Sequence, residues 1–254
     1  MLNTVKHVCG STLTATDGAI GQVKEVYFDD MAWAIRYLVV DTGTWLSGRE
    51  VLISPYSVRQ PVGSEGNIDV NLSREQVRNS PVTDTHQPVS RRHERETLGY
   101  YGYPEYWGGG DLWAMSALPM LPLPVGVDSQ AELFRRQDEV PAEDVHLRSS
   151  VQVTGYDIQA SDDSIGHVKD FIFDEASWAV RYLVVDTRNW WPGGRKVLLA
   201  TRWIDRIDWA EQTVYTTLTR AQVKGSPEYD EAAIIDRDYE QRLHEAYGRE
   251  AYWD

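Results

Sequence analysis

The chain has one cysteine, Cys9, among its 254 residues, so it cannot form an internal disulfide. A single cysteine fits a reducing compartment, and the N-terminal residues lack an apolar signal core, so we expect a cytoplasmic protein. Basic residues are also scarce, because 25 lysines and arginines stand against 39 acidic residues, giving a net charge of −14. Binding to a phosphate backbone depends on clustered lysine and arginine, so nucleic acid is not an expected partner.

The sequence also lacks the arrangements that carry catalysis or hold a metal ion. Its six histidines form no i, i+4 pair, and it contains neither a Gly-x-Ser-x-Gly elbow nor a phosphate-binding glycine loop. The acidic pairs Asp29-Asp30 and Asp174-Glu175 lack the ligand spacing of a calcium loop and are interpreted as turn residues. We therefore expect no catalytic residue, no metal site and no cofactor, and we predict that the protein is not an enzyme.

A long internal repeat is the dominant feature that the chain does contain. Residues 21–45 recur at 166–190 with an offset of 145, and fifteen of these 25 positions are identical. After one inserted residue near Gly194 the offset becomes 146, and the match continues to the Tyr-Trp pairs at 106–107 and 252–253. A period of this length indicates two complete folding units and not a solenoid.

The repeat divides the chain into three parts. We predict a first unit with its tail at 1–107, a connector rich in glycine and proline at 108–146, and a second unit with its tail at 147–254. Within the connector, the run 112–127 carries no charge but contains three prolines. A membrane-spanning helix needs about 20 apolar residues without such breaks. Packing against a domain surface is therefore favoured, and no integral membrane span is expected.

Each unit has the pattern of short strands followed by a helix. In the segments 33–41 and 178–186, apolar residues occupy both faces, which is typical of a strand buried on both sides in a small barrel. Helical tails are predicted over 90–101 and 236–247. The expected fold class is mainly β, with two tandem small β-barrels that are each followed by a helical and aromatic tail.

Both copies also carry the spacing of a helix capping box. Ser73 precedes Gln76 by three residues in the first copy, and Thr219 precedes Gln222 in the second. In such a box the hydroxyl and the amide side chain each bond the other residue's backbone N–H. The two positions therefore predict the start of a short helix.

The residues that the copies share resemble the PRC-barrel family. They read Gly-x-Val-Lys-Asp/Glu, then Trp-Ala-x-Arg-Tyr-Leu-Val-Val-Asp-Thr, then Trp and a later Val-Leu, over about residues 5–82 and 150–228. The resemblance implies a small, strongly bent β-barrel of the type in the photosynthetic reaction-centre H subunit and the ribosome maturation factor RimM. In both it is a non-catalytic module that docks on another protein. The chain is similar to stand-alone double PRC-barrel proteins of bacteria.

Four charged residues lie in or at the end of the most apolar strands, namely Arg36 and Asp41 with their counterparts Arg181 and Asp186. A charge is costly to bury without a partner, so a structural role in the barrel is favoured over a docking role. For the two aspartates, the simplest role is to accept backbone N–H groups of the loop that follows.

The loops after these strands contain the candidate protein-binding residues, which are Trp45, Arg49, Trp190, Trp191 and Arg195. Tryptophan and arginine on exposed loops are enriched at binding hot spots. The alternative is that each indole ring covers the end of its own barrel or the other unit, and both interpretations stay open.

The sequence favours a non-enzymatic protein-binding or adaptor module whose partner is unidentified. The alternative is a peripheral component of a photosynthetic or other membrane electron-transfer complex, with the run 112–127 as the contact. An enzyme with a site distributed between the units is a third and weaker interpretation. The tails also suggest a pseudo-two-fold pairing of the two units, and a homodimer stays an open alternative.

Overall fold

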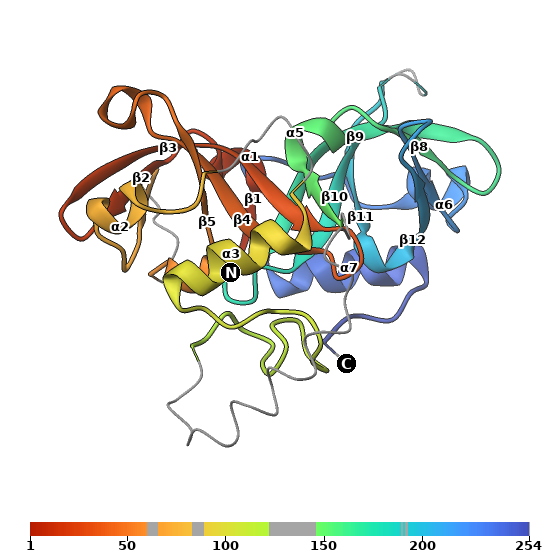
Figure 1. Ribbon diagram of the computed structural model, residues 1–254. Helices are drawn as coiled ribbons and strands as arrows, with labels where there is room; N and C mark the ends of the chain where they lie inside the picture. The colour runs from red at the N-terminus through yellow and green to blue at the C-terminus, as the bar shows by residue number, and fades with distance from the viewer. Residues whose placement is uncertain (60–65, 83–88, 122–145, 189, 191–192, 254) are drawn as a thin grey trace. The chain divides into compact units, whose positions relative to one another are not determined.

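The computed structural model describes residues 1–59, 66–82, 89–121, 146–188, 190 and 193–253. These residues form mainly β structure with short helices, arranged in two compact units with one sheet each (Figure 1). Unit 1 comprises Met1, Val5–Ser149 and Asp174–Ala179, and unit 2 comprises Leu2–Thr4, Ser150–Phe173 and Val180–Asp254. The predicted fold class, two small β units with short helices, is confirmed.

The sheet of unit 1 has the strand order β5-β4-β3-β2-β6, with β7 paired to β3. Its strands are β2 (Thr12–Ala15), β3 (Gly18–Asp29), β4 (Ala34–Asp41), β5 (Glu50–Ile53), β6 (Asn67–Asp69) and β7 (Leu147–Ser149). Its helices are α1 (Val5–Val8), α2 (Arg74–Arg78) and α3 (Arg91–Tyr101). The ladders are antiparallel except for the parallel pair β2–β6. Because β4 occupies one edge of β3 along its second half, β2 and β7 share the other edge.

The sheet of unit 2 repeats this plan in the order β11-β10-β9-β8-β13-β12, with β1 paired to β9. Its strands are β1 (Leu2–Thr4), β8 (Asp157–Gln159), β9 (Ser164–Asp174), β10 (Val180–Asp186), β11 (Lys196–Ala200), β12 (Ile204–Asp208) and β13 (Thr213–Thr216). Its helices are α5 (Ser150–Val153), α6 (Arg220–Gly225) and α7 (Arg237–Tyr247).

Each sheet contains a short strand that the repeat assigns to the other copy. Leu2–Thr4 begins the first copy in the sequence but joins the sheet of unit 2, and Leu147–Ser149 begins the second copy but joins the sheet of unit 1. Each compact unit therefore includes one short strand from the half of the sequence that forms most of the other unit. Sequence identity marks where a copy starts, but it does not specify which sheet the first strand completes.

The central strand β4 is enclosed on both faces, as its pattern predicted. All residues from Ala34 to Val40 are buried, including the guanidinium-bearing Arg36 at 2% exposure. A tryptophan with a left-handed backbone precedes this strand and its counterpart β10, with φ of 50° at Trp33 and 59° at Trp178. Trp178 is fully buried, and Trp33 stacks on Phe28 with ring centroids 5.4 Å apart.

The predicted helices are present, and their ends are capped. Both capping boxes are formed, since Ser73 and Thr219 accept the N–H groups of Gln76 and Gln222 while the glutamine side chains bond back. The helical tails predicted over 90–101 and 236–247 are α3 and α7. A serine or aspartate caps the start of each tail helix, and a glycine with a left-handed backbone ends it.

Glycine is required where the long strand of each unit passes the end of the next strand. A Cβ at Gly21 would lie 2.0 Å from the backbone oxygen of Asp41, and one at Gly166 would lie 2.1 Å from that of Asp186. Such distances are far below van der Waals contact, so any side chain would push the two strands apart. This close approach fixes where the loop after Asp41 or Asp186 begins.

Candidate functional site

The two arginines proposed from the sequence as docking residues bind backbone carbonyls of their own unit. Arg49 donates from Nη1 to the carbonyl of Arg78 at 3.0 Å and from Nη2 to that of Pro81 at 2.7 Å. Arg195 donates from Nη2 to the carbonyl of Lys224 at 2.6 Å. Helix ends leave carbonyls without helical partners, so a cation there is stabilising. Each arginine therefore joins its loop to the end of α2 or α6.

The loop tryptophans are half-buried and stack with arginines of the same two helices. The Trp45 indole donates its N–H to the carbonyl of Ile20, and the guanidinium of Arg74 lies 4.5 Å from a ring centroid of Trp45. In the second copy, Arg220 lies 4.5 Å from Trp190. The remaining proposed residue, Trp191, lies outside the described residues. One face of each described ring, Trp45 and Trp190, thus packs against an arginine of its own unit.

The strand-end aspartates bond the loops that follow them. Asp41 Oδ1 accepts the N–H of Gly43 at 2.8 Å, and Asp186 Oδ1 accepts that of Arg188 at 3.1 Å. The Arg188 guanidinium also bonds the buried Asp186 carboxylate, and this hydrogen bond lowers the pKa of Asp186 to about 2. The structure places both aspartates at turns, as expected for carboxylates that cap a loop.

The other two structural candidates, Arg36 and Arg181, lie under the aromatic tails. The Arg36 guanidinium stands 3.9 Å from the Tyr106 ring centroid, donates to the carbonyl of Leu112 at 2.7 Å and lies 3.6 Å from Asp29. Arg181 lies 4.3 Å from the ring of Tyr252. A cation over an aromatic face is stabilised most where water is excluded. Both arginines thus join a central strand to the tail of the unit.

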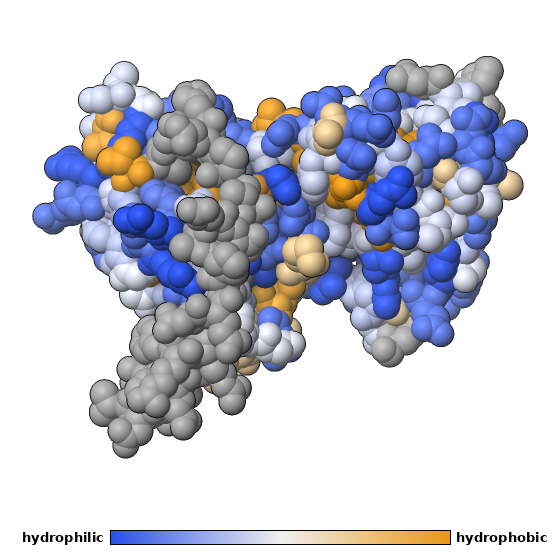
Figure 2. All heavy atoms as spheres, turned by 45° about the vertical axis from the view of Figure 1, so that its right-hand side comes forward, coloured by the Kyte–Doolittle hydropathy of each residue, from blue (hydrophilic) through white to orange (hydrophobic). Residues whose placement is uncertain are grey.

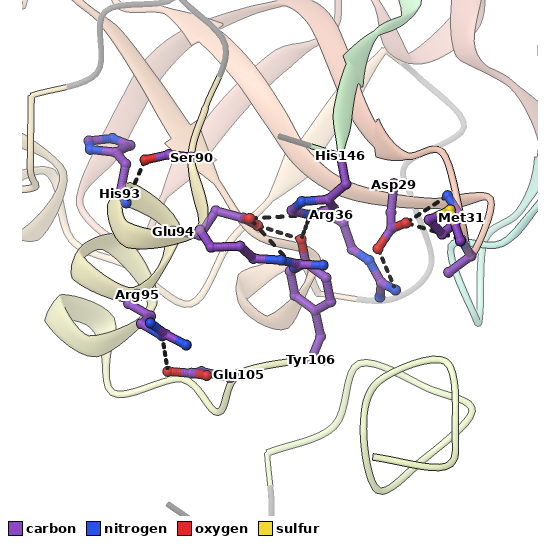
Figure 3. Close-up of polar contacts among 12 residues, drawn as sticks. Asp29, Met31, Arg36, Ser90, His93, Glu94, Arg95, Glu105, Tyr106 and His146 are labelled. Atoms are coloured by element: carbon purple, nitrogen blue, oxygen red, sulfur yellow. Dashed lines mark hydrogen bonds and ion pairs between the residues drawn. The ribbon is translucent and has the colours of Figure 1, made fainter. Parts of the chain in front are cut away.

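Near Arg36, unit 1 contains a buried polar cluster that we call the tail lock. It is formed by Glu94, Tyr106 and His146 (Figure 3), together with Arg91. The Tyr106 hydroxyl donates to Glu94 Oε2 and lies 2.8 Å from His146 Nε2. His146 Nε2 and Arg91 Nη1 lie 3.2 Å and 3.6 Å from Glu94 Oε1. The Glu94 side chain of α3 thereby joins the tail to the segment before β7.

Burial dominates the protonation of this cluster. Glu94 has no exposed surface, and its removal from water raises the pKa of the carboxyl to about 8, against the opposing influence of the nearby Arg91. The same burial raises the pKa of the Tyr106 hydroxyl well above its usual range. At neutral pH the neutral form of Glu94 therefore predominates, and the cluster contains hydroxyl and carboxyl groups in place of an ion pair.

Unit 2 has its own tail lock with the same helix and tail residues. Glu240 of α7 accepts the hydroxyls of Tyr182 at 2.9 Å and Tyr252 at 2.8 Å, and Arg237 lies 3.1 Å from its other oxygen. An imidazole is again present, since His244 Nε2 lies 3.1 Å from the Tyr182 hydroxyl. Polar groups buried in this way are tolerated because each glutamate side chain has several polar partners.

Sequence reasoning missed the tail locks, although a signal was present. Arg91, Glu94 and Tyr106 recur at the 146-residue offset as Arg237, Glu240 and Tyr252. The imidazoles could not be found in this way, because His146 precedes β7 while His244 lies within α7.

Two open hollows lie on the surface of unit 2. One, of about 310 Å³, is lined by Asp157, Asp163, Ser164, Gly166, Trp190 and Arg220. Another, of about 330 Å³, lies between Arg195 and Tyr229. Within the described ranges, no three His, Cys, Asp or Glu side chains are grouped so that they could hold a metal ion.

An apolar segment emerges from unit 1 directly after its tail. Trp113 anchors it, because its ring is 3% exposed and its indole N–H donates to the carbonyl of Ser177 at 2.8 Å. The residues after this anchor expose large apolar side chains, with Met115 at 65%, Met120 at 62% and Leu121 at 53%. We call residues 115–121 the apolar segment. Elsewhere, on the face drawn in Figure 2, hydrophilic residues predominate and hydrophobic patches are small.

Two sheets of equivalent topology, each closed by a helix and a polar tail lock, define a tandem small-barrel protein. The PRC-barrel domain family matches residues 10–77 and 149–223, more than half of the chain. The chain therefore belongs to the PRC-barrel family, as the shared residues predicted. No curated protein matches it. In the part of the chain that the structure describes, no helix is long and apolar enough to cross a membrane.

Proposed function

We propose that this chain is a non-enzymatic protein-binding module that docks a partner protein through the apolar segment. The observation that carries the proposal is the contrast around Trp113. The ring is buried and hydrogen-bonded, whereas Met115, Met120 and Leu121 immediately beyond it are more than half exposed. Single exposed apolar residues are common on protein surfaces, but a group of them in one short stretch indicates a binding surface.

The charged groups of the units support a scaffold role. Glu94 and Glu240 are buried and bonded within the tail locks, and Arg49 and Arg195 bind backbone carbonyls at the ends of short helices. Groups held in this way stabilise the barrel and leave the apolar segment as the surface that a partner would recognise. Methionine suits such a surface because its unbranched thioether adapts to irregular pockets.

The chemistry of the segment favours a protein over an anionic membrane. Residues 112–121 carry no charge, and the chain as a whole has a net charge of −14. An anionic bilayer would repel so acidic a protein. A partner with an apolar groove and a basic rim would satisfy both the segment and the surrounding charge.

The test is a comparison of bound proteins between matched variants. A triple variant with Met115→Asp, Met120→Asp and Leu121→Asp should lose the partner that the wild-type chain retains in an affinity experiment. Ile234→Asp is the control, since Ile234 is 80% exposed but lies in unit 2. Equal retention by the triple variant would refute the proposal, as would binding to anionic vesicles that the triple variant abolishes.

A further inference from the structure

We propose that two molecules of this chain exchange short strands, so that Leu147–Ser149 of one molecule pairs with β3 of the other. We call Leu2–Thr4 and Leu147–Ser149 the exchanged strands, because each already joins the sheet formed mainly by the other half of the sequence. The partner is thus a second copy of the chain, and the contact is strand addition. This inference goes beyond the proposed function, because it uses a sheet edge and does not involve the apolar segment. It rests on the exchange already present in both sheets.

The two donor strands are equivalent. Leu2–Thr4 and Leu147–Ser149 lie at the repeat offset of 145, and each is followed at once by a four-residue helix, α1 or α5. Each donor is joined to its own copy by a single peptide bond, yet it pairs in the unit formed mainly by the other copy. Each acceptor edge therefore takes the equivalent strand of the repeat from the other half of the sequence.

The acceptor edge of unit 1 holds its donor by backbone pairing and by side chains. In the antiparallel ladder, Tyr27 lies opposite Ser149 and Phe28 opposite Arg148. Arg148 Nε donates to Asp30 Oδ2 at 2.7 Å, and the N–H of Asp30 donates to the carbonyl of His146 at 3.0 Å. These bonds bind a particular short sequence in one register, so they select a strand of this repeat.

One of these bonds recurs in the other copy. The N–H of Glu175 donates to the carbonyl of Met1 at 2.9 Å, at positions equivalent to Asp30 and His146. The two exchanged segments are thus held alike just before their strands. A geometry that appears twice at the repeat offset is a property of the repeat, and a second copy of the chain carries the same donors and acceptors.

The covalent connection within one chain is the only factor that favours pairing with the chain's own donor strand over the same strand of a second molecule. A donor tethered to its acceptor has an effective concentration of about 1 mM, so trading between copies competes only near that protein concentration or when chains refold together. Exchange of an identical element between protomers needs no new interface, because every contact already exists within one chain.

Paired cysteines test this directly in the full chain. In a Cys9→Ala background, one preparation carries Tyr27→Cys and another carries Ser149→Cys. The two are unfolded together, refolded at a protein concentration on the order of 1 mM and oxidised. Because these two positions are opposed in the ladder, their side chains come within disulfide reach only when β7 pairs with β3.

The expected result is a cross-linked dimer from the mixture, several-fold above the dimer from either preparation alone. A chain with both substitutions is the positive control, because it should cross-link internally at any concentration. A mixture of Tyr27→Cys with Val151→Cys, two residues beyond the donor, should give background only. The unmodified chain gives a second readout, since holding it near 1 mM should convert part of it to a dimer measured by light scattering.

Internal cross-linking of the double variant without a dimer from the mixture would overturn the proposal. Failure of the double variant to cross-link would overturn it as well, because the β3–β7 pairing would then be wrong. If the cysteine variants fail to refold, an unmodified chain that stays monomeric near 1 mM is decisive against it. Acidic substitutions in the apolar segment should leave the cross-link unchanged, which separates this test from that of the proposed function.

Discussion

Replacing Glu94 by glutamine should remove a pH dependence of stability that originates in the unit 1 tail lock. Burial raises the pKa of Glu94 in the folded protein to about 8, whereas the ordinary value is 4.5. A carboxyl with a raised folded pKa contributes fully below the unfolded pKa, and its contribution is lost as the pH rises through the folded pKa. The wild-type chain should therefore lose stability between pH 5 and about pH 8.

The size of the effect follows from the shift. A displacement of this extent corresponds to about 5 kcal/mol in the free energy of unfolding, as an upper figure for a fully buried group. Glutamine has the same shape and still accepts the Tyr106 hydroxyl through its amide oxygen, but it does not ionise. The E94Q variant should therefore approach or exceed wild-type stability at pH 8 and lag behind it at pH 5.

Denaturant unfolding of both proteins at several pH values between 5 and 9 measures this difference. The E96Q variant is the matched control, since Glu96 is on the same helix but its side chain is 53% exposed. Its stability should run parallel to that of the wild-type chain. A parallel course for E94Q as well would refute the reasoning, as would a stability deficit of E94Q that grows with pH, because either result means that Glu94 ionises when folded.

Three further predictions follow from the packing. Gly166→Ala places a Cβ 2.1 Å from the carbonyl oxygen of Asp186 and should lower the free energy of unfolding by about 1–3 kcal/mol. The control Gly225→Ala places its Cβ where no atom lies within 4 Å, so its stability should be close to that of the wild-type chain. Thermal unfolding measures both variants. Arg49→Ala removes bonds to carbonyls at the end of α2 and should cost about 1–3 kcal/mol in denaturant unfolding, and an unchanged midpoint would contradict the tether. Tyr106→Phe leaves the buried Glu94 short of a donor and should cost a similar 1–3 kcal/mol, seen as a lower Tm.

The fold could be predicted from the sequence because each structural signal occurs in both copies of the repeat. Apolar residues on both faces of 33–41 predicted a buried strand, and residues 34–40 are buried. The capping boxes and the tail helices were equally local signals, and each formed within a residue of its predicted position. Such local patterns predict structure well because the same residues make the same short-range contacts in both copies.

The candidate site was less accessible from sequence. Arg49 and Arg195 have the character of docking residues, yet they bind carbonyls about 30 residues away, which no local pattern reveals. In the tail lock of unit 1, His146 contacts Glu94, which lies 52 residues earlier in the sequence. Pairing over such separations depends on topology, and the topology itself includes a strand that the repeat assigns elsewhere.

The exchanged strands also set where this protein can be cut for expression. A fragment that begins at Ser150 would retain most of its repeat but lack β1, which pairs with β9. One that ends before Leu147 would lack β7 and leave part of one edge of β3 unpaired. An open strand edge is prone to aggregation. Insolubility of either half would therefore report a missing ladder and carry no information about the folding competence of a single barrel.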